Sequence, residues 1–325
     1  MSFDRALQPI LAQRVFEGVN TARYLPWVAL VAVWILWGST YSAIRVAVET
    51  IPPYLMIGTR YVIAGLLLWG IHYAIASRKP SLPSLRDLAR IAVTGILLLV
   101  LGNGLLAFSE TRVPSGIAAL LVASMPIWML ILEALRVRTM ISIASIAGLI
   151  IGSAGVFLLV GELSGQANGF YAALILFSAF AWALGTIYAR TTIHHPLTVP
   201  FEMIAGGVVA VAVGLFLGEA RHFSLAQVSA QSWYGMLWLV TGGAMVGYTA
   251  YAFIVRTLPA PTVATYAYVN PIVAVVLGVL LLREPVTWNV VAGGLAIVAS
   301  VAVILIGNRR LDSQLEGNAG EEVAA

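Results

Sequence analysis

Residues 37–45 read WGSTYSAIR and residues 182–190 read WALGTIYAR, so a tryptophan and an arginine coincide at both ends when the chain is shifted by 145 positions. The same shift brings further residues together: Gly102, Phe108 and Pro114 fall on Gly247, Phe253 and Pro259, and Pro126 and Gly148 fall on Pro271 and Gly293. Trp, Phe and Pro are uncommon residues, and they match here in one register without a gap. The chain is therefore predicted to contain an internal duplication.

The composition around these segments is that of a membrane protein. Of 325 residues, 60% are hydrophobic and 10% are charged, against roughly 25% charged in ordinary globular proteins. Ten apolar stretches approach the length of about 20 residues that spans a bilayer, and their continuous apolar character favours helices over barrel strands. They cover Trp27–Val48, Pro53–Ile75, Leu88–Phe108, Val113–Leu132, Ile141–Val160, Gly169–Tyr188, Val199–Leu217, Tyr234–Val255, Pro259–Leu282 and Trp288–Ile306. We expect an all-α integral membrane protein with ten transmembrane helices.

The positive charges predict the orientation of these helices. With the N-terminus in the cytoplasm, 13 of the 18 Lys and Arg residues fall in inner segments, and the outer loops hold only Arg112, Arg221 and Arg283. Cytoplasmic loops of membrane proteins carry such an excess of positive charge. Both termini are therefore expected in the cytoplasm.

An odd number of spans in each copy inverts the second copy relative to the first. The expected organisation is a cytoplasmic segment (1–26), a first five-helix repeat (27–160), a linker (161–168), a second five-helix repeat (169–306) and a cytoplasmic tail (307–325). Inverted repeats are typical of secondary transporters, whose substrate site lies near the midplane between the repeats. A non-transporting sensor or scaffold is the alternative, but the short loops offer no soluble domain for it.

Two stretches carry a resemblance to a known family: WGSTYSAIRVAVETIPPYLMIGTRY at 37–61 and GNGLLAFSETRVPSGIAALLVASMP at 102–126. Over residues 27–306 the chain resembles the EamA-type permeases of the drug/metabolite transporter superfamily, and VPSGIAALLVASMP is similar to their YedA-like branch. The resemblance implies a multi-pass carrier of the bacterial inner membrane that exports amino acids, metabolites or toxic compounds without ATP. Family members often end the fourth span with Glu near the position of Thr139, a feature present here only in the second copy, as Arg283-Glu284.

Polar and aromatic residues within the spans are the predicted substrate-cavity residues. They are Trp37, Asn103, Trp182, Tyr248, Tyr251, Tyr266 and Asn270. Tyr266 and Asn270 are four residues apart and so share a helical face. The alternative for the two Asn residues is a hydrogen bond that joins neighbouring helices. For the aromatic residues the alternative is a place in an interfacial belt.

A second set of residues is predicted to bend or gate the helices. Pro126 and Pro271 each remove a backbone hydrogen bond and are expected to kink the fourth and ninth spans. Arg45, Arg60 and Glu110 are expected at the outer end, as a positive vestibule or an ion-pair gate. Arg45 is spaced to pair with Glu49, and Glu110 is placed to meet Arg60 or Arg112. Topology and packing are the alternative explanation for these charges.

Catalytic motifs are absent from the sequence. It contains no Cys, HExxH, GxSxG or P-loop, and Lys79 is its only lysine. We expect no enzyme, no cofactor, no metal site and no nucleic-acid partner, but a small-molecule substrate, the lipid bilayer, and a monomer or homodimer. Asp and Glu are also absent from the middle of the spans, which favours exchange driven by the substrate gradient over proton antiport. Proton coupling is the alternative, and Glu110 is the residue that would carry the proton.

Overall fold

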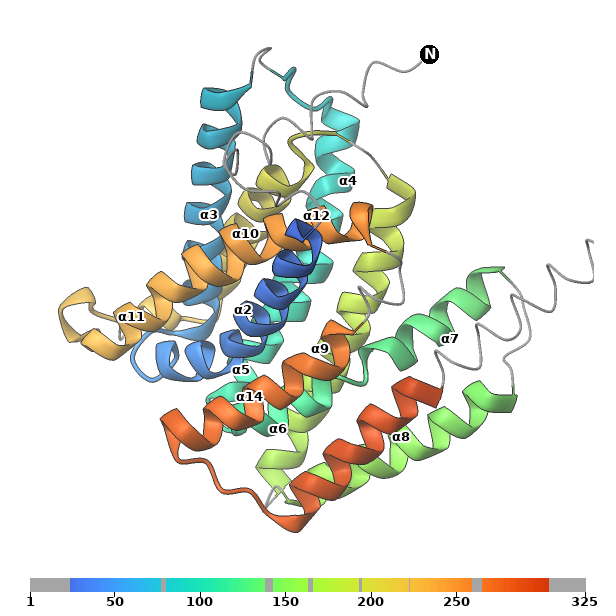
Figure 1. The fold of residues 1–325 in the computed structure, drawn as a ribbon. Helices are drawn as coiled ribbons and strands as arrows, with labels where there is room; N and C mark the ends of the chain where they lie inside the picture. The colour runs from blue at the N-terminus through green and yellow to red at the C-terminus, as the bar shows by residue number, and fades with distance from the viewer. Residues whose placement is uncertain are drawn as a thin grey trace, which may run out of the picture.

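Helices make up most of the computed structural model, which describes residues 24–76, 80–137, 143–162, 166–192, 195–221, 223–258 and 265–303 (Figure 1). The elements are α2 (Leu25–Ala47), α3 (Pro53–Ile75), α4 (Leu85–Gly95), the π-helical η2 (Ile96–Gly104), α5 (Leu105–Glu110), α6 (Ser115–Val122), α7 (Met125–Val137), α8 (Ile143–Glu162), α9 (Gln166–Thr192), α10 (Thr198–Phe216), the 3₁₀ turns η3 (Glu219–Arg221) and η4 (Leu225–Gln227), α11 (Ala230–Trp238), the π-helical η5 (Leu239–Gly247), α12 (Tyr248–Thr257), α14 (Tyr266–Leu282) and a last helix over Trp288–Val303.

Six of these helical stretches are long and apolar enough to cross a membrane. They are Leu25–Ala47, Pro53–Ile75, Leu85–Glu110, Ser115–Arg136, Gly169–Ala189 and Thr198–Phe216. Shorter apolar helices cover Ile146–Leu159, Val269–Leu282 and Trp288–Val303. The chain is thus an all-helical multi-pass membrane protein, whereas ten crossing helices in two inverted repeats remain a prediction. The predicted start of the ninth span at Pro259 lies outside the described residues.

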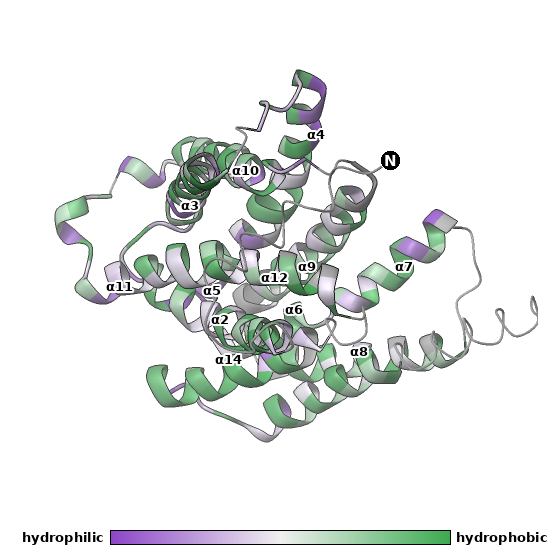
Figure 2. Cartoon of the chain, turned by 45° about the horizontal axis from the view of Figure 1, so that its top comes forward, coloured by the Kyte–Doolittle hydropathy of each residue, from purple (hydrophilic) through white to green (hydrophobic). Residues whose placement is uncertain are grey.

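The outer surface of the helices is strongly apolar. Phe216 and Phe157 are 90% and 79% exposed, and Figure 2 shows hydrophobic residues along most helices, with hydrophilic ones gathered near the ends of α4 and α7. Exposed apolar area of this extent marks a binding or membrane surface. Lipid contact explains it, because the apolar side chains cover the lengths of the helices.

Two continuous helices share an unusual feature in their middle. The helix α4–η2–α5 contains nine π-helical residues, and so does the helix α11–η5–α12. These are the third and eighth predicted spans, which the shift of 145 relates to each other. Both π-helical segments contain glycines, Gly102 in one and Gly247 in the other, at matching positions. Such segments are rare and frequently lie at functional sites.

Helices α3 and α10 cross where matching residues of the two halves meet. A Cβ added to Gly207 would lie 2.8 Å from the backbone nitrogen of Val62, and Val62 and Gly207 are themselves 145 positions apart. It would also lie 2.8 Å from the carbonyl oxygen of Gly58. Small residues allow backbones to approach this closely in membranes. In a two-fold arrangement, a residue next to the axis meets its own counterpart, as Val62 and Gly207 do.

Other contacts between helices occur in pairs that the same shift exchanges. Trp37 lies against Gly247, and Trp182 lies against Gly102. In the same way, Gly243 meets Thr40 where Gly185 meets Leu98. Adding 145 to the first-half residue number of one contact, and subtracting 145 from its second-half residue number, gives the other contact. The two halves therefore pack on each other through equivalent surfaces.

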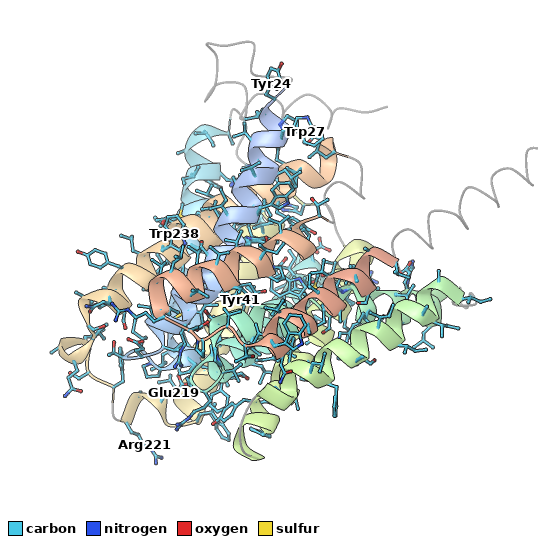
Figure 3. All side chains as sticks on the ribbon, turned by 60° about the horizontal axis from the view of Figure 1, so that its bottom comes forward. Tyr24, Trp27, Tyr41, Glu219, Arg221 and Trp238 are labelled. Atoms are coloured by element: carbon cyan, nitrogen blue, oxygen red, sulfur yellow. The ribbon has the colours of Figure 1, made fainter. Side chains whose placement is uncertain are left out.

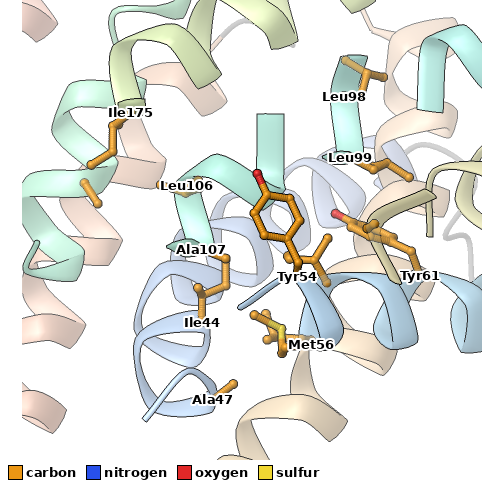
Figure 4. Close-up of a cluster of buried hydrophobic side chains, with 14 of the residues drawn as sticks. Ile44, Ala47, Tyr54, Met56, Tyr61, Leu98, Leu99, Leu106, Ala107 and Ile175 are labelled. Carbon is orange, nitrogen blue, oxygen red and sulfur yellow. The ribbon is translucent and has the colours of Figure 1, made fainter. Parts of the chain in front are cut away.

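Buried apolar side chains from both halves fill the space between these helices (Figure 4). The largest buried group joins Ile44 of α2, Met56 of α3, Leu99 of η2 and Ile175 of α9, among others. Leu99 and Ile175 are fully buried. This core fixes the rotation of α2 and α3, which carry much of the site described below.

Two glutamates of the second half each bind the start of a helix in the first half. The carboxylate of Glu284 accepts hydrogen bonds from the backbone nitrogens of Ser115 (2.7 Å) and Gly116 (3.0 Å), at the start of α6. The carboxylate of Glu219 accepts from Tyr54 and Leu55 at the start of α3, at 3.2 and 2.9 Å. The first N–H groups of a helix lack partners within it and favour negative charge. We refer to Glu219 and Glu284 as the capping glutamates.

Both capping glutamates follow a residue with left-handed backbone. These residues are Gly218 (φ 79°) and Arg283 (φ 56°), each at the end of its helix. The carboxylate of Glu284 also needs space beside α14, where a Cβ on Gly278 would collide with Oε2. Figure 3 places Glu219 at the opposite end of the molecule from Tyr24 and Trp27. The capping contacts thus join segments that the charge pattern assigns to the outer side.

Candidate functional site

An aromatic cluster joins α2, α12 and α14 around Trp37. The ring centroid of Trp37 lies 4.9 Å from that of Tyr251, 5.5 Å from that of Tyr248 and 5.6 Å from that of Tyr266. Tyr251 and Tyr266 are 5.7 Å apart, and all four rings are half-buried. Edge-to-face pairs at these distances are favourable. The structure therefore brings together four of the seven predicted cavity residues, called the aromatic cluster below.

Two glycines of the π-helical segment η5 set the position of Trp37. The indole Nε1 donates a hydrogen bond to the carbonyl oxygen of Gly243 at 3.2 Å. A Cβ added to Gly247 would lie 2.5 Å from the same nitrogen, too close for any side chain. The glycines thus provide both the acceptor and the space that the indole needs.

Trp182 approaches the aromatic cluster from the second half. Tyr266 and Trp37 both pack against one group of buried residues. Tyr266 and Trp182 both pack against a second group, formed by Met125, Ala179 and Ala183. Tyr266 therefore links the two tryptophans that the shift of 145 relates.

Asn103 is the counterpart of Tyr248 under the shift of 145. It is half-buried in the π-helical segment η2. Its Nδ2 donates a long bond, 3.5 Å, to the carbonyl oxygen of Leu98, five residues earlier. At this length the bond leaves most of the hydrogen-bonding capacity of the amide free. Asn103 thus places a polar group in the first half at the position that Tyr248 occupies in the second.

Asn270 is buried and joins two helices. It is 6% exposed, and with its amide oriented to suit its neighbours, Nδ2 donates to the carbonyl oxygens of Tyr266 and Trp34, each at 3.2 Å. The orientation follows from the hydrogen-bond network. These bonds connect α14 to α2 beside the aromatic cluster, so Asn270 positions Tyr266 and Trp34. Its contact with substrate remains a prediction.

The two predicted prolines lie in different local structures. The helix is interrupted at Ala123 and Ser124, directly before Pro126, and resumes as α7 at Met125. Pro271 lies inside α14, which continues past it. The backbone hydrogen bond that Pro126 removes is therefore accommodated by a break in the helix. The bond that Pro271 removes is accommodated within a helix that stays continuous.

The outer charges form contacts other than the pairs expected from their spacing. Arg45 donates through Nη1 to the backbone carbonyl oxygen of Glu110, not to Glu49. The Glu110 side chain is fully buried, and neither carboxylate oxygen has a hydrogen-bond partner among the described residues. Arg60 and Arg112 both lie beyond ion-pair distance from it. Arg45 and Arg60 nevertheless interact with Glu110 electrostatically.

Arg60 is buried on α3, next to the aromatic cluster. It is 3% exposed; its Nη2 donates to the Tyr61 hydroxyl, and its guanidinium carbon lies 4.3 Å from the Tyr61 ring centroid. The Tyr61 ring is in turn 6.5 Å from that of Tyr248, at an interplanar angle of 84°. Rings thus connect the buried guanidinium to Trp37 through Tyr61 and Tyr248.

Several residues of this site were not predicted from the sequence. Tyr61, Tyr41 and Trp34 contribute to it, and Glu202 of α10 is buried (8% exposed) and interacts electrostatically with Tyr61 and Tyr248. Two signals pointed to some of them. Tyr41 is four residues after Trp37 and four before Arg45, on one helical face, and Tyr61 directly follows Arg60. Glu202 carried no such signal, because it lies near the end of its span.

Metal ligands do not cluster in the described part of the chain. Among residues 24–303 outside the gaps given above, no group of three or more His, Asp or Glu side chains is placed to hold a metal ion. The polar groups of the site are instead the amides of Asn103 and Asn270, tyrosine hydroxyls, the Arg60 guanidinium and the carboxyl groups of Glu110 and Glu202. Such groups bind organic molecules by hydrogen bonds and charge.

The fold and the site define a helical multi-pass membrane protein with buried polar and aromatic groups between two packed halves. Comparison with known proteins then gives its family. The EamA-like transporter family matches residues 25–161 and again residues 169–306, so the chain belongs to that family of transporters.

Individual relatives agree with the family. The chain is 38% identical to the inner membrane transporter YedA of Escherichia coli K12, over 77% of this chain and 80% of YedA. It is 27% identical to the transporter YvbV of Bacillus subtilis, over 83% of this chain and 88% of YvbV. A probable amino-acid metabolite efflux pump of Salmonella typhimurium is 24% identical, over 85% of this chain and 93% of the pump.

One solved structure has a similar fold. The crystal structure matches 87% of this chain and 97% of its own chain, with a TM-score of 0.61 at 16% identity. At this identity the likeness concerns the fold alone. The helical arrangement described above is thus one that has been observed by crystallography.

Proposed function

We propose that this protein is a secondary carrier that moves small amphipathic organic molecules across the bacterial inner membrane by alternating access, without ATP, with export as the net direction. One observation carries the proposal. The aromatic cluster joins Trp37 of the first half to tyrosines of the second, Trp182 packs against the same buried group as Tyr266, and contacts between the two halves are exchanged by the shift of 145. Carriers built from inverted repeats bind their substrates near the midplane between the repeats. Family membership supports transport as the activity.

We propose that the two halves, residues 27–160 and 169–306, are inverted in the membrane with both termini in the cytoplasm. The support is the match of one family to both ranges, together with the paired contacts of Trp37 with Gly247 and Trp182 with Gly102. The distribution of Arg residues supports the orientation. Rocking of one half against the other would then expose the site to each side in turn.

The chemistry of the site supports amphipathic substrates. The aromatic cluster offers ring faces and tyrosine hydroxyls, which bind apolar groups and polar groups respectively. The buried guanidinium of Arg60 is joined to it through the ring of Tyr61. A relative named as an amino-acid metabolite efflux pump supports export of molecules of this kind.

The test is counterflow in liposomes that contain the purified protein. Liposomes loaded with unlabelled amino acids or aromatic metabolites should accumulate the corresponding labelled compound, and Trp37→Ala should slow this exchange by about tenfold or more, because the ring contacts around Trp37 are lost. Trp27→Ala is the matched control: it changes the same residue type on the same helix, but Trp27 is 52% exposed and lies at the end of α2. Counterflow of no compound in the panel would overturn the proposal.

The same liposomes test the energy source. We propose exchange driven by the substrate gradient, and a pH gradient at zero membrane potential should therefore not drive accumulation of a neutral substrate. Glu110 is the residue to examine, because its carboxylate is buried and has no hydrogen-bond partner in the described part of the chain. Accumulation that a pH gradient drives, and that is lost in Glu110→Gln, would establish proton coupling instead.

Cysteine labelling tests the position of the site. The chain contains no cysteine, so Tyr266→Cys and Asn270→Cys introduce single thiols. Both should react with water-soluble thiol reagents in at least one transport condition, because thiolates form only where water reaches. Leu67→Cys is the control and should stay unlabelled, since Leu67 is 48% exposed on the apolar outer face of α3. Labelling of Leu67→Cys alone would contradict a central cavity at Tyr266 and Asn270.

A further inference from the structure

The capping glutamates join the two halves at the end of the molecule that the charge pattern assigns to the outside, called the outer end below. Each glutamate follows a helix of the second half, α10 or α14, and binds the first turn of a helix of the first half, α3 or α6. The residues that donate these bonds are all buried: Tyr54, Leu55, Ser115 and Gly116. Buried N–H groups require an acceptor. Separation of the halves at the outer end would therefore break both capping contacts.

A third contact between the halves lies at the same end. The hydroxyl of Ser232, fully buried near the start of α11, donates to the carbonyl oxygen of Val46 near the end of α2 at 2.9 Å. It also accepts a hydrogen bond from the hydroxyl of Thr50 at 2.8 Å. Helix α2 belongs to the first half and α11 to the second. Hydrogen bonds from three places thus hold the outer end together.

The positions equivalent to the capping glutamates carry no carboxylate. With the halves inverted as proposed, the equivalent contacts fall at the cytoplasmic end, where the shift of 145 replaces Glu219 by Ala74 and Glu284 by Thr139. Ala74 lies within α3, whereas Glu219 follows the left-handed turn at Gly218 after α10. Thr139 lies outside the described residues. The cytoplasmic end therefore has no charged acceptor at either position.

The donors of the two contacts are changed as well. Leu55 corresponds to Pro200 in the first turn of α10, and Gly116 corresponds to Pro261, which lies outside the described residues. Proline has no backbone N–H and cannot donate to a carboxylate. Each equivalent contact thus lacks its acceptor and one of its two donors. The halves pack through equivalent surfaces, but the bonds that close the outer end cannot be repeated at the cytoplasmic end.

We propose that Glu219 and Glu284 form an outer latch, which holds the substrate-free protein closed to the outside and leaves its site accessible mainly from the cytoplasm. This inference rests on the proposed carrier function and its orientation. Bonds that are present in one of two states stabilise that state alone and shift the population toward it. The latch therefore favours the state in which an exporter takes up its substrate.

Thiol labelling from each side of the membrane tests the latch. Asn103→Cys is the reporter, because Asn103 is half-buried, its hydrogen bond is long (3.5 Å), and the chain contains no cysteine. A membrane-impermeant maleimide reaches the outer side in spheroplasts and the cytoplasmic side in inverted membrane vesicles. Without substrate, the reporter should react faster in inverted vesicles. Faster reaction in spheroplasts would overturn the proposal.

Loss of either glutamate should open the outer end. In the reporter background, Glu219→Ala and Glu284→Ala should each speed labelling from the outside by about tenfold, the effect of losing hydrogen bonds to a charged group. Labelling from the cytoplasmic side should not become faster. Because one opening breaks both contacts, the two increases should multiply in the double variant. Glu49→Ala is the matched control, since it removes an exposed carboxylate at the same end and should change neither rate.

The comparison of the two sides distinguishes a latch from a purely structural role. General loosening would speed labelling from both sides, and this result would overturn the latch. An outer rate that stays unchanged in either single variant would overturn it too. Glu219→Gln and Glu284→Gln serve as second variants if the alanine variants do not fold. They keep one carbonyl acceptor without the charge, and should give smaller increases in the same direction.

Further outcomes separate the latch from the carrier function. The labelling experiment uses no substrate, so it reports the conformation and not transport. The expected shift in a protein that shows no counterflow would refute the carrier function and leave the latch intact. Counterflow in a protein whose labelling is the same in all variants would refute the latch alone.

Discussion

Gly207→Ala is expected to destabilise the protein by about 3 kcal/mol, because the new Cβ meets backbone atoms that have no room to move. Its neighbours would be the carbonyl oxygen of Gly58 and the nitrogen of Val62, both at 2.8 Å. The clash can be relieved only if α3 and α10 move apart where they cross. Such a separation would also disturb Arg60, which lies between Gly58 and Val62 on α3.

Thermal unfolding in detergent measures this effect. The readout is the amount of protein that stays monodisperse as the temperature rises. Gly70→Ala is the matched control on α3, because nothing lies within 4 Å of a Cβ added at Gly70. There the substitution should be neutral or stabilising by about 0.5–1 kcal/mol, the usual gain in helix propensity. The two glycine variants should therefore differ in sign. Equal stabilities would show that α3 and α10 do not approach as described.

Glu284→Ala is expected to lower the stability by about 3 kcal/mol, since two backbone N–H groups at the start of α6 lose a charged acceptor. The bonds that are lost join Glu284 to Ser115 and Gly116, at 2.7 and 3.0 Å. Glu284→Gln keeps one carbonyl oxygen and should have an intermediate effect. The order Glu, Gln, Ala in unfolding temperature is the expected result.

Glu133→Ala is the control for the loss of a carboxylate. Glu133 pairs with Arg136 on the exposed surface of α7, with side chains 40% and 51% exposed. Pairs of this kind contribute only about 0.5 kcal/mol. A loss at Glu284 no larger than that at Glu133 would mean that the capping contact contributes little to stability.

Much of the fold was predictable because hydropathy and repetition are local properties of a chain. Apolar runs define helices such as α2, α3 and α10, whose ends lie within a few residues of the predicted spans. The shift of 145 was predictable from matched residues in one register, such as Trp37 with Trp182 and Pro126 with Pro271. The break before Pro126 was signalled only as a kink, since the sequence does not reveal whether tertiary packing keeps the helix continuous, as at Pro271.

The candidate site was predictable in part. Trp37, Tyr248, Tyr251 and Tyr266 do meet, but the spacing within a helix identified only the pair Tyr266 and Asn270 as sharing a face. Asn270 turned out to bond the Trp34 carbonyl of another helix. Arg45 binds the backbone carbonyl of Glu110 instead of the Glu49 side chain, because the end of α5 lies within its reach. Contacts of these kinds depend on helix rotation, which no local pattern specifies.

The sequence by itself determined that this protein is a helical membrane protein with a duplicated chain, because burial in lipid requires long apolar helices and duplication leaves matching residues at a constant offset. Only the tertiary structure decided which faces meet. It buried Arg60 and Glu110 without pairing them, brought Trp37 against Gly247, and set Glu284 on the start of α6. The physical reason is that residues on different helices come together through crossing angles and close packing of whole side-chain surfaces, and these are properties of the assembled chain.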